Sequence, residues 1–185
     1  MVPRDLLILP FIFSVLVLNA DPAAKALPDR SNLIEKMGEV STGDGPKSLM
    51  FTPDGRFLVT ALLFGSGIEV YSVEPLSLAE KIVLDDIVTG FVELVFNQSR
   101  NEIWVSQMLT HSIHILDGDT YQPLRVIPSG GEWPKVLAFS SDENTAYASH
   151  WITKDVSFID VHSGDLTALV PIPGIPRGLA VSKNS

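Results

Sequence analysis

The chain has 185 residues and a formal net charge of −9 at neutral pH, and apolar residues make up 45% of it. A chain of this length and composition can bury a core, and its negative charge opposes a nucleic acid or an anionic membrane as partner. It contains no cysteine. This excludes disulfides, thiolate zinc sites, cysteine nucleophiles and a covalently attached c-type haem.

The N-terminus has the pattern of a targeting segment. Arg4 precedes a 13-residue apolar run at residues 6–18, which is too short to span a bilayer comfortably. Small residues follow, and cleavage is expected after Ala20 or Ala26. The sequence therefore predicts a signal peptide and processing region at 1–26, with an uncleaved membrane anchor as the alternative. The mature protein is expected to be secreted, periplasmic or at the cell surface, with no membrane partner after cleavage.

The remainder of the chain is an internal repeat. Residues 51–59, 96–104 and 139–147 share a phenylalanine, a polar turn and an apolar run, and their phenylalanines are 45 and 43 residues apart. The segments 68–71, 113–116 and 156–159 keep the same offsets. The repeat predicts units at about 46–90, 91–133 and 134–175, and a fourth that begins at 176.

Each unit has the pattern of four β-strands. In the first unit, apolar runs with period two or short continuous runs predict strands at 47–51, 56–61, 68–73 and 78–84. The first turn needs a residue that tolerates positive φ, for which Gly55, Asn101 and Asn144 are expected. Four strands in about 43 residues are the dimensions of a propeller blade. The predicted fold is all-β, a β-propeller of about three and a half blades over residues 27–185.

The repeated motifs resemble the YVTN family of propeller repeats. The motifs are Gly43-Asp44-Gly45-Pro46, Thr52-Pro53-Asp54-Gly55, Gly131-Glu132-Trp133-Pro134, Ala146-Tyr147-Ala148-Ser149-His150 and Val156-Ser157-Phe158-Ile159-Asp160. The second unit departs from this pattern, with Gly90-Phe91 lacking the proline and Asn97-Gln98-Ser99-Arg100 in the turn. The resemblance covers about residues 40–185. It implies the fold, whereas the family includes binding proteins, surface antigens and relatives of enzymes.

Propellers usually close with four to eight blades, and three complete units fall short of that number. We therefore expect a truncated gene product, a gene-model fragment or half of an assembly. Unpaired strand edges at both ends would then favour self-association.

Three cations share one position of the repeat. Lys47, Lys135 and Arg177 each follow the proline that precedes the first strand of a unit. In a propeller these positions form an arc at one mouth of the central channel, which predicts an anion-binding site. The alternative is an ordinary solvated surface, with the cations paired to Asp44 or Glu132.

Two further residues are candidates at the same rim. His150 ends the second strand of its unit and is the best single candidate for a polar ligand contact, with an exposed loop histidine as the alternative. Trp133 is expected as an exposed contact in the loop before the third unit. Trp104 and Tyr147 share a slot that predicts interblade core. His111 and His114 point to opposite faces of a strand, which makes joint metal binding awkward.

No catalytic motif is visible, so no catalytic residues, metal site or cofactor is predicted. We expect an exported scaffold, not an enzyme, that binds an unknown protein, a polysaccharide or a small anionic ligand through the rim. The alternative is the N-terminal part of a propeller enzyme, a lactonase-like hydrolase or a periplasmic dehydrogenase subunit, with its catalytic residues in blades beyond this sequence.

Overall fold

The computed structural model describes residue 36 and residues 38–182, and the predicted signal peptide at 1–26 lies outside this part. All regular secondary structure in the described part is β-strand. None of the described residues forms a helix that is long and apolar enough to span a membrane. The strands are β1 Pro46–Phe51, β2 Phe57–Leu62, β3 Gly67–Ser72, β4 Ser77–Val83, β5 Phe91–Asn97, β6 Glu102–Gln107, β7 Ser112–Asp117, β8 Pro123–Pro128, β9 Pro134–Phe139, β10 Thr145–His150, β11 Asp155–Asp160 and β12 Leu166–Pro171.

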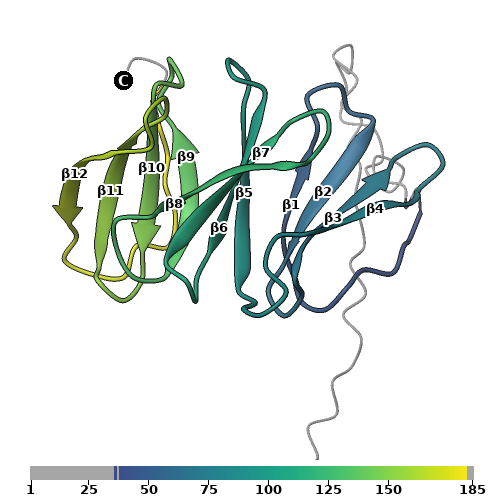
Figure 1. The fold of residues 1–185 in the computed structure, drawn as a ribbon, viewed down its shortest axis with the longest axis horizontal. Helices are drawn as coiled ribbons and strands as arrows, with labels where there is room; N and C mark the ends of the chain where they lie inside the picture. The colour runs from purple at the N-terminus through teal and green to yellow at the C-terminus, as the bar shows by residue number, and fades with distance from the viewer. Residues whose placement is uncertain (1–35, 37, 183–185) are drawn as a thin grey trace, which may run out of the picture.

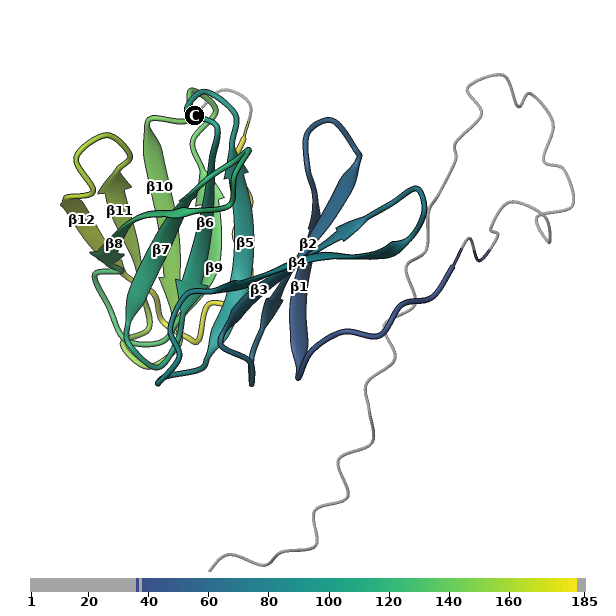
Figure 2. The ribbon, with the colours of Figure 1, turned by 45° about the vertical axis from the view of Figure 1, so that its right-hand side comes forward.

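The strands form three four-stranded antiparallel sheets: β1–β4 (blade 1), β5–β8 (blade 2) and β9–β12 (blade 3). Within each blade the strands pair in chain order, and the strands of blade 1 lie within one residue of their predicted ranges. The blades stand side by side, and the first strand of each contacts the first strand of the next (Figures 1 and 2). The all-β, propeller-like prediction is thereby confirmed.

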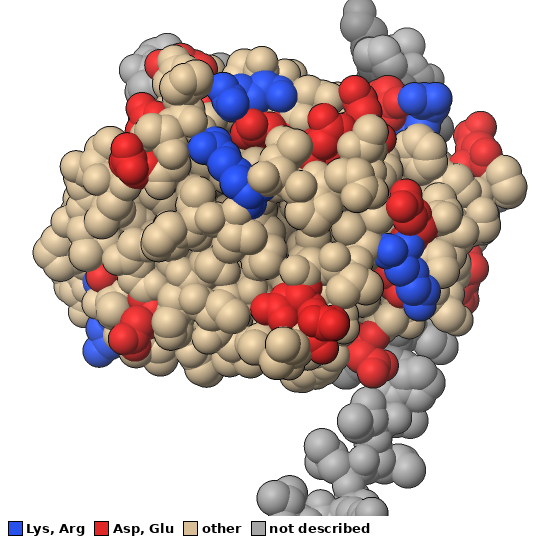
Figure 3. Space-filling view, viewed as in Figure 1, with Lys and Arg blue, Asp and Glu red and all other residues tan. Residues whose placement is uncertain are grey.

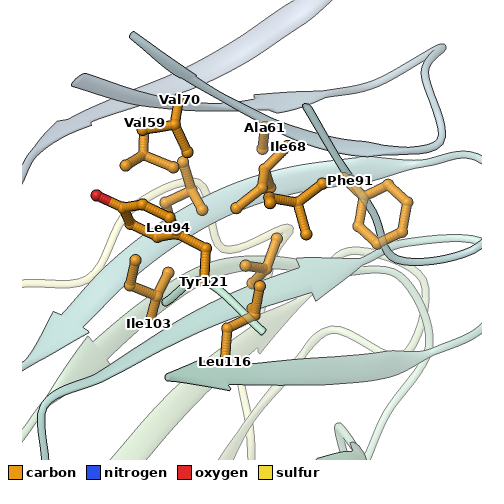
Figure 4. Close-up of a cluster of buried hydrophobic side chains, with 11 residues drawn as sticks. Val59, Ala61, Ile68, Val70, Phe91, Leu94, Ile103, Leu116 and Tyr121 are labelled. Carbon is orange, nitrogen blue, oxygen red and sulfur yellow. The ribbon is translucent and has the colours of Figure 1, made fainter. Parts of the chain in front are cut away.

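Apolar side chains between neighbouring blades form the core. Between blades 1 and 2, residues such as Val59 and Ile68 from one sheet meet Phe91 and Leu94 from the other (Figure 4). Between blades 2 and 3, Trp104 is fully buried. Its ring meets that of Phe139 edge to face, with centroids 5.3 Å apart. The prediction of Trp104 as interblade core is confirmed, and each sheet is stabilised mainly by its neighbour.

The turn between the first two strands of blade 3 differs from the prediction. Glu143, not Asn144, has the positive φ, at 58°. Gly55 and Asn101 have positive φ as predicted. The backbone carbonyl of Glu143 accepts a hydrogen bond from Asn97 Nδ2 at 3.1 Å, and its carboxylate accepts one from the Ser99 amide. The unfavourable conformation is thus compensated by bonds to the neighbouring blade, which a single repeat does not reveal.

Residues 176–182, where the sequence predicts a fourth unit, form no strand. Leu179–Ser182 instead help to line an apolar groove of about 460 Å³ on the outer face of blade 3. The other side of the groove includes Tyr147, Phe158 and Val170. Tyr147, predicted as interblade core, therefore lies on a face that no further sheet of the described residues covers.

Candidate functional site: a cationic cluster at one rim

One end of the blades, here called the mouth rim, is where the first strand of each blade begins and the second ends. The arrows of β10 and β12 point toward it in Figure 1. At this rim, the loop that leads into each blade lies beside the loop that joins the second and third strands of that blade. We call these the entry loops (43–45, 84–90 and 129–133) and the middle loops (63–66, 108–111 and 151–154).

A β-bulge places the lysines at this rim. Pro46 pairs with Leu62 and Ser48 with Ala61, so Lys47 is the extra residue between two paired positions. The register shifts in the same way around Lys135. A bulge redirects the side chain of its extra residue, which removes these lysines from the regular alternation of the strand. At the equivalent position in blade 2, Val92 is buried.

Trp151, in the middle loop of blade 3, is the platform on which two of the cations converge. Lys135 Nζ lies 4.8 Å from the centroid of a Trp151 ring, and Arg177 Cζ lies 4.9 Å from it. Indole is the aromatic side chain that attracts cations most strongly. The backbone amide of Trp151 donates to the Trp133 carbonyl at 3.1 Å, which fixes the middle loop against the entry loop.

The surroundings of the cluster change the titration of Lys135. Burial lowers the pKa of Lys135 to about 8, and the nearby charges of Lys47 and Arg177 contribute to the decrease. Glu93 is the acidic group that faces them; burial raises the pKa of Glu93, against the opposing effect of the two lysines. Within the described part of the chain, none of the three cations lies within 4.0 Å of a carboxylate oxygen. The site therefore holds concentrated positive charge without a close counter-ion.

The surroundings also contain unused polar atoms. Among the described residues, the buried side-chain atoms without a hydrogen-bond partner are Ser48 Oγ, His150 Nε2 and Trp151 Nε1. Ser48 lies near the start of β1, His150 ends β10 and Trp151 follows it in the middle loop, so all three residues lie at the mouth rim. A buried polar atom without a partner is costly, and two of these three atoms belong to consecutive residues of the rim, His150 and Trp151.

His150 lies beneath the surface of the rim. Its ring is fully buried, and its Nδ1 is 2.8 Å from Asp155 Oδ1. Burial lowers the pKa of His150, against the effect of Asp155. Asp155 also accepts a bond from Thr153 Oγ1, which in turn accepts one from the Glu132 amide. In this conformation His150 supports the two loops and does not present its ring to solvent, unlike the exposed histidine considered from the sequence.

Trp133 is half-buried in the entry loop of blade 3 and has a φ of 62°. Its amide donates to His111 Nδ1 at 3.1 Å, so it links blade 3 to blade 2. His114 is buried and its Nε2 lies 2.7 Å from Gln107 Oε1. No group of three metal-ligating side chains occurs among residue 36 and residues 38–182.

Of the residues predicted from the sequence, the structure brings Lys47, Lys135 and Arg177 together. It places His150 below them and Trp133 in the adjoining loop. Their role in ligand binding stays a prediction. The aromatic platform, Trp151, directly follows His150 in the sequence and lies in the middle loop of blade 3. On the face drawn in Figure 3, by contrast, basic residues are dispersed among acidic ones and form no single patch.

Comparison with known proteins identifies one clear relative by sequence. No family model matches the chain, so membership of the YVTN family stays a resemblance. Antigen Lp49 of Leptospira interrogans is 33% identical over 148 residues, which cover 77% of this chain and 32% of the relative. The chain thus spans about a third of the length of that protein.

Three solved structures share the fold. A functionally unknown protein from Desulfotomaculum acetoxidans has a TM-score of 0.68 and 16% identity, over 84% of this chain and 51% of that one. Hydrazine synthase of Kuenenia stuttgartiensis has a TM-score of 0.65 and 18% identity, over 77% of this chain and 41% of that one. The periplasmic gluconolactonase PpgL of Pseudomonas aeruginosa has a TM-score of 0.63 and 20% identity, over 77% of this chain and 44% of that one. The last two are propeller-type proteins. At these identities the likeness concerns the fold and carries no activity to this chain.

Proposed function

We propose that the protein is an exported or surface-exposed propeller-repeat protein that binds an anionic ligand at the mouth rim. The observation that carries the proposal is the convergence of Lys135 and Arg177 on Trp151, with Lys47 close enough to lower the pKa of Lys135. The chain has a net charge of −9, yet it gathers three cations that have no carboxylate oxygen of the described residues within 4.0 Å, and such a cluster concentrates anions locally.

Export is supported by the predicted signal peptide and by two comparisons. The relative from Leptospira is named an antigen, and PpgL is described as periplasmic. N-terminal sequencing of the protein from its native host checks this part. A mature chain that begins at Val2 would contradict it.

The binding test uses oligoglutamate of about ten residues as the anionic probe, and binding is followed by tryptophan fluorescence and by calorimetry. Replacement of Lys47, Lys135 and Arg177 by alanine is expected to weaken binding roughly tenfold or more and to flatten its salt dependence. The matched control, Lys36→Ala with Arg56→Ala and Arg100→Ala, changes the net charge by the same amount. Arg56 and Arg100 lie in the turns between the first and second strands of their blades, at the end opposite the mouth rim. Equal loss in both variants, or none in either, would contradict a dedicated site.

The enzymatic alternative, an N-terminal part of a lactonase-like hydrolase or a dehydrogenase subunit, is supported by fold likeness alone. We therefore do not adopt it.

A further inference from the structure

The middle loops display one large apolar side chain per blade. Phe64, Leu109 and Ile152 occupy the second position of their loops, separated by the repeat offsets of 45 and 43 residues. They are 67%, 50% and 51% exposed. Scattered exposed hydrophobic residues need no explanation, but three at one structural slot on one rim form a pattern. Ile87, in the entry loop between blades 1 and 2, is 88% exposed and adds a fourth.

These side chains are held in their exposed positions. The amide of Phe64 donates to the Asp44 carbonyl at 3.2 Å, and the amide of Ile152 donates to the Glu132 carbonyl at 3.3 Å. The Phe64 ring also lies over Gly45, where a Cβ would come within 2.7 Å of it. Each middle loop is thus bound to its entry loop, and the apolar groups are fixed before any partner arrives.

The apolar residues are continuous with the cationic cluster. Lys135 Nζ lies 4.0 Å from Met108 Sδ, and Met108 directly precedes Leu109. Trp151, which carries Lys135 and Arg177, directly precedes Ile152. Positive charge therefore lies between apolar groups contributed by successive blades.

From this arrangement we infer that the ligand of the mouth rim is an extended acidic peptide segment of a partner protein, with apolar side chains next to its carboxylates. The inference rests on the proposed anion site and specifies its ligand. The carboxylates complement Lys47, Lys135 and Arg177, and the apolar side chains pack on Phe64, Leu109 and Ile152. A small anion could contact the cations but could not also reach the three apolar side chains, because these lie on separate loops.

A flat anionic membrane fits this rim less well. The entry loops also carry Asp44, Asp86 and Glu132, all exposed, and the chain has a net charge of −9. These carboxylates would face the lipid phosphates and oppose docking. A peptide can place its acidic groups over the cations and keep them away from the carboxylates of the entry loops.

The test compares two probes of equal charge and length, three repeats of Glu-Gly-Leu-Gly and three of Glu-Gly-Ser-Gly, titrated against the purified protein. We expect the leucine peptide to bind roughly tenfold or more tightly. Replacing Phe64, Leu109 and Ile152 together by serine is expected to abolish that preference. Serine at Leu78, Leu124 and Val126, which are 42%, 55% and 55% exposed on β4 and β8, is the matched control and should preserve it.

The outcomes separate the two proposals. Equal binding of both peptides would overturn the apolar contribution and leave the anion site standing. Binding of neither would overturn the anion site itself. Sedimentation with phosphatidylglycerol vesicles that is lost in the Phe64, Leu109 and Ile152 variant would assign the rim to a lipid surface and overturn the peptide.

Discussion

The face that blade 2 turns toward blade 3 and the face that blade 3 turns outward are built from the same four slots of the repeat. In blade 2 the slots hold Trp104, Ile113, Ile115 and Ile127, and in blade 3 they hold Tyr147, Val156, Phe158 and Val170. Ile127 is 8% exposed, whereas Val170 is 41% exposed. The residue types are equally apolar, so the difference comes from the neighbouring sheet and not from the sequence of the blade.

Blade 3 therefore has an apolar face of the kind that packs against a neighbouring sheet, and the described residues provide no such sheet. Tyr147 and Phe158 pack against each other edge to face, with centroids 4.9 Å apart, and line the groove beside Leu179–Ser182. A surface of this kind usually marks an interface.

The largest expected effect comes from truncating the side chain at one repeat position, first on the covered face of blade 2 and then on the open face of blade 3. Trp104→Ala should lower the free energy of unfolding by about 3–5 kcal/mol, because it leaves a cavity between two packed sheets. Tyr147→Ala should cost only about 1 kcal/mol, because solvent can fill the space on the open face. Urea unfolding measures both. Equal losses would show that the face of blade 3 is covered in solution.

The second effect concerns association. We expect the purified chain to self-associate through the open face, and Val170→Asp to weaken that association at least tenfold, about 1.4 kcal/mol, because it buries a charge in the groove. Leu169→Asp, one residue earlier on the same strand, is the control. Leu169 occupies the slot of Val126, which is exposed on blade 2. Sedimentation velocity checks the prediction, and a wild-type chain that stays monomeric at all concentrations would contradict it.

The repeat predicted much of this architecture because every unit has the same pattern of strands and turns. Period-two runs located the strands to within one residue in blade 1, and register alone brought Lys47, Lys135 and Arg177 to one rim. Asp117 and Asp160, at the same position of successive units, cap the turns that follow β7 and β11. Asp117 Oδ1 accepts bonds from the Asp119 and Thr120 amides, and Asp160 Oδ1 accepts one from Ser163.

Features that depend on contacts between units were not predictable in the same way. The burial of His150 depends on Gly131, where a Cβ would lie 2.6 Å from the imidazole ring. The positive φ of Glu143 depends on bonds to Asn97 and Ser99 of another blade. The slot shared by Phe64, Leu109 and Ile152 was visible by alignment of the units. Its exposure was not, since the same residue types fill the core.

The smallest expected effect is a pH dependence at the cationic cluster, which contrasts this rim with the solvated cations elsewhere. Burial lowers the pKa of Lys135 to about 8. Anion binding requires the protonated lysine, so affinity for oligoglutamate is full well below pH 8 and falls as the pH rises through that value. We expect a severalfold loss between about pH 7 and about pH 9.5, consistent with one partly exposed ion pair. Lys135→Arg keeps its charge throughout this range, so its affinity should stay constant, while Lys135→Met should bind weakly at every pH. A pH-dependent loss that persists in Lys135→Arg would assign the titration to another group and remove Lys135 from the site.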